Sequence, residues 1–233
     1  YTTMDAKRST RYRGLSLLLL PALLVLCGGC ANTLFYYPTQ DDYGTPKAYG
    51  LPYEEVTFAS KDGTRLRGWF IPAPGDAKGT VVHFHGNAQN MSAHFPLVAW
   101  LPQRGFNVFT FDYRGYGDSE GSLSRTGIYE DGVAAVDYVR TRKDVDPDKV
   151  VILGQSMGGA KAIAVAGTGS AEKVKAVAVD SAFNSYRQIA REKLDEVPVL
   201  GWFRHPLVYM SLDEDYAPER HVADISPTPL MIF

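Results

Sequence analysis

Cysteine is scarce in this sequence. Of its 233 residues only Cys27 and Cys30 are cysteines, and both lie near the N-terminus. The chain beyond residue 30 can therefore form neither a disulfide bond nor a metal site with thiolate ligands. A domain folded there must be held together by its apolar core, and a hydrophobic content of 45% over this length suffices for one sizeable core or two small ones.

An excess of charge is also absent. The chain has 24 basic and 26 acidic residues, and its formal net charge is −2 at pH 7. The chain lacks the surplus of basic residues that would indicate a nucleic-acid partner. The sequence contains no evident internal repeat or low-complexity tract, so an ordinary globular domain is expected.

A hydrophobic run long enough to cross a bilayer comfortably is lacking as well. The most apolar stretch, residues 15–26, is short. Small residues follow it and a basic segment precedes it, which is the order of an export signal; the basic residues are Lys7, Arg8, Arg11 and Arg13. Residues 1–30 resemble a bacterial lipoprotein signal that is cleaved before Cys30, whose thiol is then lipidated. This resemblance implies a membrane-anchored, exported lipoprotein of the bacterial cell envelope.

The two flanks of the expected domain leave alternatives open. Cys27 stands where lipoprotein signals usually carry leucine; the alternative to a lipoprotein signal is a plain signal peptide or an uncleaved anchor. Residues 31–52 are rich in Tyr, Pro, Gly and Asp without a periodic pattern, which predicts a tether. Residues 229–233 have the pattern of a buried strand that has only begun, so we expect the domain to be truncated at its C-terminus.

Residues 53–233 have the pattern of one α/β domain. Strands are expected at 54–59 and 65–71 as an antiparallel pair, then at 80–85, 106–111, 150–153, 174–179 and from 225. Helices are expected at about 92–101, 126–140 and after Ser156. This alternation predicts a mainly parallel sheet covered by helices on both faces. Residues 183–224 break the rhythm and contain a possible helix at 186–194; we interpret them as a short lid, the alternative being an ordinary helix with a long loop.

The strongest motif follows the aliphatic run Val150–Leu153. Gly154-Gln155-Ser156-Met157-Gly158 fits the G-x-S-x-G nucleophile elbow, a sharp turn from strand to helix. Residues two before and two after the serine must lack bulk, because the strained turn brings them close together. The turn exposes the serine hydroxyl at a helix N-terminus, where free N–H groups favour developing negative charge.

Two further motifs extend this pattern into a family resemblance. His85-Gly86-Asn87-Ala88 and Asp112-Tyr113-Arg114-Gly115-Tyr116-Gly117-Asp118-Ser119 precede the elbow, each after an expected strand. In this order the three motifs resemble the serine-aminopeptidase-like and ABHD-type, depalmitoylase-like branch of the α/β-hydrolase superfamily, over residues 56–233. The resemblance implies that Ser156 is the nucleophile and that the backbone N–H groups of Met157 and Asn87 hold the oxyanion. It also implies that the loop after Asp112 is architectural, with Asp112, Arg114 and Asp118 paired with each other.

Other interpretations of these motifs are weaker. His83 and His85 lie on one face of their strand, as a metal pair does, but no third ligand lies nearby in sequence. We expect His85 to pack beneath the loop instead. Gly115-x-Gly117 does not complete G-x-G-x-x-G, so a nucleotide site is not expected, and no cofactor is implied.

The sequence does not show a complete catalytic triad. In this fold the acid and then the histidine follow the serine along the chain. The remaining histidines are His94, His205 and His221, and all three precede the strand that should present the acid. His205 is expected in the packing of the lid and His221 on the surface. Asp180, which ends a strand, is the alternative acid; otherwise it caps the turn and helix that follow. We therefore expect the acid and the histidine beyond Phe233.

These observations predict a serine hydrolase that cleaves an ester, thioester or amide bond through an acyl-enzyme. The expected substrate is a small-molecule or lipid-like acyl compound, and the expected membrane contact is the lipid anchor. The 233-residue chain alone is expected to be inactive and poorly stable. The alternative is a lipid-anchored envelope protein that uses the same α/β fold for binding without catalysis.

Overall fold

The computed structural model describes residues 36–169, 174–195 and 214–233, without the side chains of residues 193–195. Residues 36–233 belong to one compact unit. The expected signal, residues 1–30 with Cys30, lies outside the described residues. Within the described ranges, no helix has the length and apolarity that a bilayer crossing requires.

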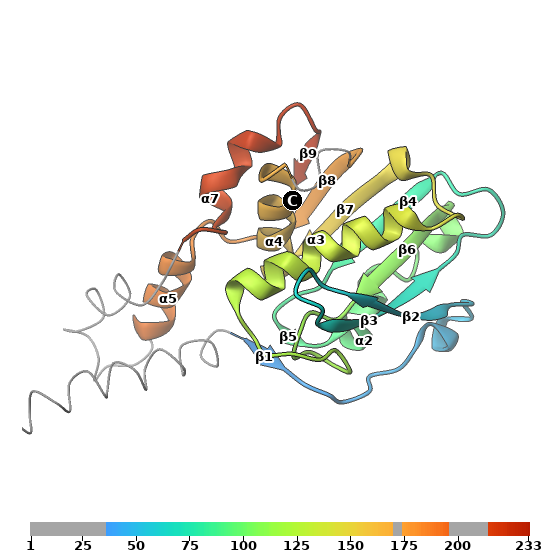
Figure 1. The fold of residues 1–233 in the computed structure, drawn as a ribbon, viewed down its shortest axis with the longest axis horizontal. Helices are drawn as coiled ribbons and strands as arrows, with labels where there is room; N and C mark the ends of the chain where they lie inside the picture. Colours follow the sequence, from blue (N-terminus) through green and yellow to red (C-terminus); the bar gives the residue numbers. More distant parts are fainter. Residues whose placement is uncertain (1–35, 170–173, 196–213) are drawn as a thin grey trace, which may run out of the picture. The chain divides into compact units, whose positions relative to one another are not determined.

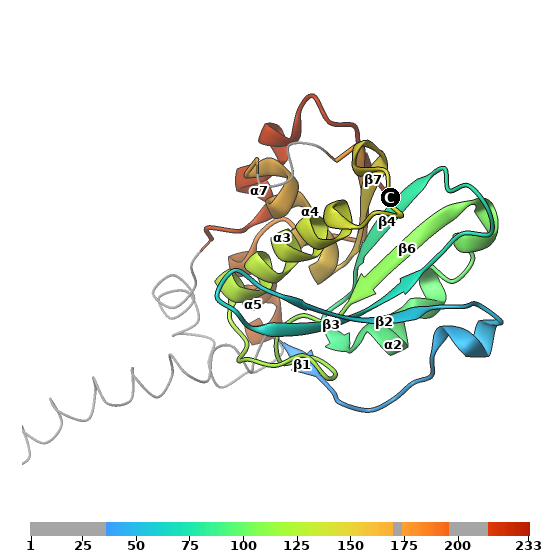
Figure 2. The same ribbon diagram turned by 45° about the vertical axis from the view of Figure 1, so that its right-hand side comes forward.

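A seven-stranded sheet organises the unit, with strand order β2-β3-β6-β4-β7-β8-β9 (Figure 1). The strands are β2 (Glu54–Ala59), β3 (Arg65–Ile71), β4 (Gly79–Phe84), β6 (Phe106–Phe111), β7 (Val150–Gln155), β8 (Ala176–Asp180) and β9 (Leu230–Ile232). The first two form the antiparallel edge, visible in Figure 2, and β6 runs antiparallel to β3. From β6 to β9 all neighbours are parallel, which confirms the predicted mainly parallel α/β sheet.

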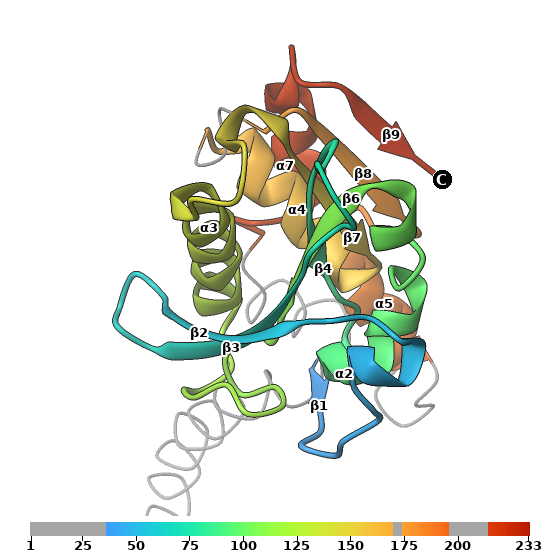
Figure 3. The same cartoon turned by 90° about the vertical axis from the view of Figure 1, so that its right-hand side faces the viewer.

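The sheet is covered on both faces (Figure 3). Helices α3 (Arg125–Thr141) and α4 (Met157–Gly167) lie on one side, where Tyr138 of α3 stacks on Phe58 and contacts Phe109. On the other side lies α2 (Met91–His94), and here Met91 joins Trp69 and other apolar residues in a second core cluster. Successive side chains of a strand point to opposite faces, so one strand supplies both layers.

The helix expected at 92–101 is interrupted. Its first turn is α2, and the 3-10 turns η2 (Phe95–Leu97) and η3 (Pro102–Arg104) follow. Pro96 and Pro102 lack the N–H that a continuous helix needs and restrict the residues before them. The helix expected at 126–140 is confirmed as α3, whose N-cap Ser124 accepts a hydrogen bond from Gly127 N.

The segment expected to be a tether packs against the domain from Tyr36 onward. Tyr36 and Leu51 are only 5% and 6% exposed. The short strand β1 (Tyr37–Pro38) pairs with β5 (Ala88–Gln89), just after β4. A tether was expected here, and the structure instead shows a segment packed on the domain. Composition alone could not predict this, because it does not show that single apolar side chains of an irregular segment pack against a core that is distant in the sequence.

The ends of the expected lid meet at one carboxylate. Helix α5 (Tyr186–Asp195) follows β8, and α7 (Pro218–His221) with the 3-10 turn η6 (Val222–Ile225) precedes β9. Between them, residues 196–213 lie outside the described ranges. The buried Glu214 carboxylate accepts hydrogen bonds from Tyr186 N, Arg187 N and Ser185 Oγ. Glu214 therefore satisfies the free N–H groups at the start of α5, although it follows α5 in the sequence and lies beyond residues 196–213.

Candidate active site

Ser156 stands at the sharp turn between β7 and α4. Its backbone has φ 51° and ψ −114°, a positive φ that residues with a Cβ rarely adopt. Its N–H donates to Asp180 O at the end of the neighbouring strand β8, at 2.8 Å. The elbow is therefore tied to the adjacent strand, with the half-buried serine at the carboxyl edge of the sheet.

The glycines two residues before and two residues after Ser156 are required because a side chain there would clash with neighbouring backbone, as the motif predicts. A Cβ on Gly154 would overlap Gly158 O and lie 2.7 Å from the Cα atom of Gly159. A Cβ on Gly158 would overlap the carbonyl oxygens of Phe84 and His85. The second contact shows that the start of α4 lies directly against the end of β4, where the Gly86–Asn90 loop begins.

Tyr116 brings the two expected oxyanion residues together. Its hydroxyl lies 2.8 Å from Asn87 O and 4.0 Å from Met157 Sδ. Tyr116 itself is fully buried, and burial raises the pKa of its phenol, so the hydroxyl keeps its proton and donates. The fold thus places Asn87 beside Met157, although they are 70 positions apart in the sequence. The role of their N–H groups stays a prediction.

His83 in β4 and His85 just after β4 are both buried. Nδ1 of His83 lies 3.1 Å from Thr110 Oγ1, and burial lowers the pKa of His83 to about 3. Nδ1 of His85 lies 2.8 Å from Gly86 O, and its ring packs on Tyr113 at a centroid distance of 4.6 Å. The described residues contain no group of three or more His, Cys, Asp or Glu side chains that could hold a metal ion.

The charged loop after β6 is architectural, but its charges do not pair with each other as expected. The Asp112 carboxylate accepts from Met91 N at 2.7 Å, at the start of α2. Arg114 pairs with Asp131 on α3 and with Asp62 in the β2–β3 turn. Burial lowers the pKa of Arg114, but these carboxylates outweigh it and hold the pKa above its ordinary value. The loop therefore joins three separate elements.

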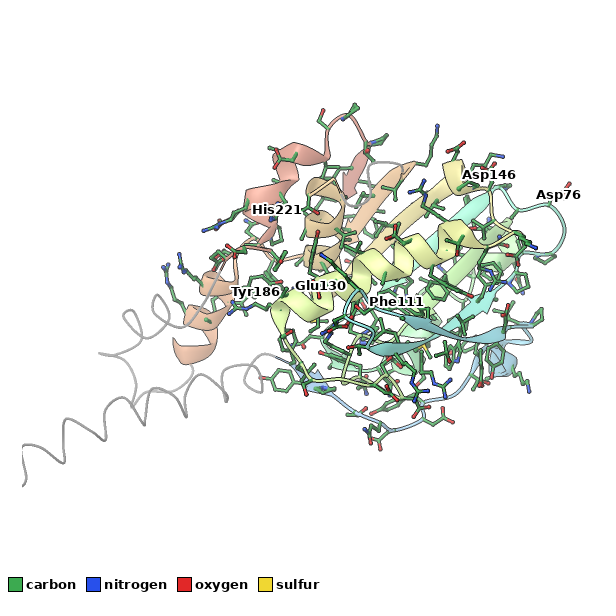
Figure 4. All side chains as sticks on the ribbon, in the orientation of Figure 1. Asp76, Phe111, Glu130, Asp146, Tyr186 and His221 are labelled. Atoms are coloured by element: carbon green, nitrogen blue, oxygen red, sulfur yellow. The ribbon has the colours of Figure 1, made fainter. Side chains whose placement is uncertain are left out.

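The described histidines do not complete a triad with Ser156. His221 packs against Gly167 at the far end of α4, which is about 16 Å from the elbow for an eleven-residue helix. It is labelled in Figure 4 on the α7 side of the unit. Both ring nitrogens of His94 bond to groups other than Ser156, namely Gln155 and Ala88. His205 lies outside the described residues.

Asp180 lies beside the elbow in register with Gln155. Its carboxylate accepts a hydrogen bond from Ser181 Oγ at 2.7 Å. The expected capping of the following helix is made instead by Glu214, as described above. Whether Asp180 or a residue beyond Phe233 serves as the acid stays a prediction.

Sequence reasoning overlooked Lys161, which lies one turn into α4. Its side chain is fully buried, and Nζ donates to Arg125 O at 3.1 Å. Nζ also lies 5.2 Å and 5.7 Å from the ring centroids of Tyr186 and Tyr216, at the two ends of the expected lid. Figure 4 shows Tyr186 near the end of α3 that carries Glu130. The available signal was a lysine among small residues in an otherwise apolar helix.

Replacing Lys161 with Met is expected to change how stability depends on pH. Burial lowers the pKa of Lys161 from 10.5 to about 7, with Arg125 acting in the same direction and Asp131 against it. Between these two values the unfolded chain binds a proton that the folded chain does not, so the lysine's contribution to stability rises with pH.

Urea unfolding at several pH values measures this effect. We expect the advantage of Lys161→Met over the wild type to be largest below pH 7 and to shrink by on the order of 4 kcal/mol as the pH rises to 10. Lys175→Met, at an exposed position, is the control and should show a flat difference. A flat difference for Lys161→Met as well would contradict the assignment.

Comparison with known proteins agrees with this architecture. Residues 75–217 match the family described as serine aminopeptidase, S33. The protein YfhR of Escherichia coli strain K12 is 47% identical over 206 residues, covering 87% of this chain and 68% of that protein. The α/β-hydrolase domain-containing protein WAV2 of Arabidopsis thaliana is 38% identical over 161 residues, covering 68% of this chain and 51% of that protein.

Solved structures agree at the level of the fold. An esterase of Pyrococcus furiosus superposes with a TM-score of 0.63 at 22% identity, covering 85% of this chain and 76% of that chain. The family match spans more than half of the present chain. Together with the strained elbow and the mainly parallel sheet, these findings show that the chain is a hydrolase of the α/β-hydrolase superfamily and belongs to its serine aminopeptidase S33 family.

Proposed function

We propose that this protein is a serine hydrolase that cleaves an ester, thioester or amide bond, with Ser156 as nucleophile. The observation that carries the proposal is the positive φ of Ser156 between two glycines that cannot bear a Cβ. A strain of this kind costs on the order of 1–3 kcal/mol and persists where the surroundings enforce it, which is common at active sites.

The reaction requires one base and two hydrogen-bond donors besides Ser156. Ser156 Oγ attacks the carbonyl carbon of the substrate while a histidine, expected beyond Phe233, accepts the hydroxyl proton. The backbone N–H groups of Asn87 and Met157 hold the oxyanion of the tetrahedral intermediate. The alcohol, thiol or amine leaves with the proton, and water then releases the acyl group as a carboxylic acid and restores the serine.

Two features of the sequence bear on the substrate class. Residues 183–224 contain several aromatic and proline residues, and residues 1–30 resemble a lipoprotein signal with lipidation at Cys30. A lid rich in aromatic residues, in a chain that also has a membrane anchor, favours a lipid-like acyl substrate at the cell envelope. The matching family is described as serine aminopeptidase, whereas the solved structure from Pyrococcus furiosus is an esterase. Both amide and ester substrates therefore belong in the assay.

Labelling by a fluorophosphonate probe tests the proposal directly. A preparation that includes the residues expected beyond Phe233 is treated with the probe, and the adduct is located by peptide mass spectrometry. We expect one adduct, on Ser156, and turnover in a panel of acyl esters, thioesters and aminoacyl amides. Absence of both labelling and turnover in folded protein would favour the non-catalytic binding alternative. The 233-residue chain, run in parallel, is expected to label weakly.

A further inference from the structure

His94 bridges the two chain segments on which the proposed oxyanion site depends. It is the last residue of α2, and its half-buried ring contacts both segments. Nε2 lies 2.9 Å from Ala88 O, the carbonyl of the residue after Asn87. Nδ1 lies 3.1 Å from Gln155 Oε1, the side chain of the residue before Ser156. One imidazole therefore connects the Gly86–Asn90 loop to the elbow.

The surroundings of His94 restrict its position. Its ring stacks on the fully buried ring of His85, with centroids 5.4 Å apart and planes at 25°. Gly86 provides space for it, since a Cβ there would lie 2.9 Å from His94 Cε1. At its other end α2 is anchored by Asn90, which caps Ser92 N, and by Asp112, which accepts from Met91 N. The ring cannot move without disturbing several of these contacts.

The ring is mainly uncharged at neutral pH. Burial lowers the pKa of His94, and His85 nearby acts in the same direction. A neutral ring with its proton on Nε2 donates to Ala88 O and leaves Nδ1 as an acceptor. A rotation of the Gln155 amide by 180° exchanges Oε1 and Nε2, and its NH2 group then donates to Nδ1. In this arrangement both bonds of the bridge are satisfied without a buried charge.

We propose that His94 is a positioning residue that fixes the separation of Asn87 and Met157, the two expected oxyanion donors. Asn87 adjoins the carbonyl that His94 holds, and Met157 follows Ser156 in the segment that Gln155 anchors. Oxyanion donors must lie about 2.7–3.1 Å from the developing charge, so a displacement of a few tenths of an ångström weakens them, and losing one costs about 10²–10³ in kcat. This role rests on the proposed function and deepens it.

The test compares His94→Phe, which keeps ring shape but removes both hydrogen bonds, with the wild type. We expect kcat to fall about 10- to 100-fold while KM stays within about threefold, because the oxyanion develops after substrate binding. His94→Gln should recover most of the loss, since its amide N–H group can occupy the place of Nε2. His221→Phe, which removes an imidazole bonded to a backbone carbonyl at the far end of α4, is the matched control and should leave kcat unchanged.

A double-mutant cycle with Gln155→Leu separates positioning from general destabilisation. If His94 acts through Gln155, the double variant should be little slower than His94→Phe alone, and the effects should be non-additive. Additive effects, a change in KM only, or a kcat of His94→Phe within about twofold of the wild type would overturn the proposal. Melting temperatures confirm that each variant is folded at the assay temperature.

The outcomes also separate this inference from the proposed function. A wild type that neither labels at Ser156 nor turns over substrate contradicts the proposed function, and the role of His94 falls with it. A wild type that labels and turns over, beside a His94→Phe variant of equal kcat, contradicts only the inference about His94.

Discussion

Replacing Ser156 with alanine is expected to lower the turnover of acyl substrates by about 10⁴-fold or more and to abolish fluorophosphonate labelling. The hydroxyl oxygen is the only non-hydrogen atom removed, and without it no acyl-enzyme can form. The melting temperature should change little, because alanine keeps the Cβ at the same positive φ and the Ser156 N–H bond to Asp180 O is made by the backbone. Steady-state kinetics and thermal unfolding measure the two effects.

Ser181→Ala is the matched control for this experiment. Ser181 also has a positive φ, 54°, and it follows β8, the strand beside β7. Its exposed hydroxyl bonds only to Asp180 Oδ1 among the described contacts. Ser181→Ala should therefore retain kcat within a few-fold. Equal losses in both variants, or persistent turnover in Ser156→Ala, would contradict a nucleophilic role for Ser156.

Replacing Asp131 with alanine is expected to destabilise the domain by about 3–5 kcal/mol. The Asp131 carboxylate is fully buried and accepts from the backbone N–H of Arg114 as well as from its Nε and Nη2 atoms. Its removal leaves a buried guanidinium whose remaining partners among the described contacts are the exposed Asp62 carboxylate and the buried Ser60 hydroxyl. For a domain of this size the melting temperature should fall by roughly 10 °C.

Asp137→Ala on the same helix is the control, because Asp137 is exposed and should tolerate the change. Asp131→Asn adds a second comparison, since the amide keeps the shape and one acceptor but loses the charge. We expect its destabilisation to lie between those of the alanine variant and the wild type. A loss below about 1 kcal/mol in Asp131→Ala would show that Arg114 finds other partners.

Strands and the elbow could be predicted because their signals are local. Alternation between Arg65 and Ile71 predicted β3 with its observed bounds, and the aliphatic run before Gly154 predicted β7. The elbow glycines were predicted from steric exclusion between residues a few positions apart, and the structure bears this out. Secondary-structure propensity and short-range steric exclusion act between residues that are close in the sequence, so the sequence is sufficient to predict their effects.

Pairings between distant elements could not be predicted in the same way. Arg114 bonds to Asp131 and Asp62, which are 17 and 52 positions away, although nearer carboxylates were expected to pair with it. Lys161 is buried because α3 and the ends of the 183–224 segment cover α4. His94 bridges positions 88 and 155, and its sequence surroundings do not mark it as special.

The sequence by itself determined the α/β alternation, the place of Ser156 at a strained strand-to-helix turn, and the resemblance to α/β-hydrolases. Those properties follow from hydrophobic periodicity and from glycines that local geometry requires. Only the tertiary structure decided which charged side chains pair and which lysine is buried. It also decided that His94 connects the Gly86–Asn90 loop to the elbow. These depend on which elements come into contact, because desolvation and hydrogen bonding act over distances in space and not along the chain.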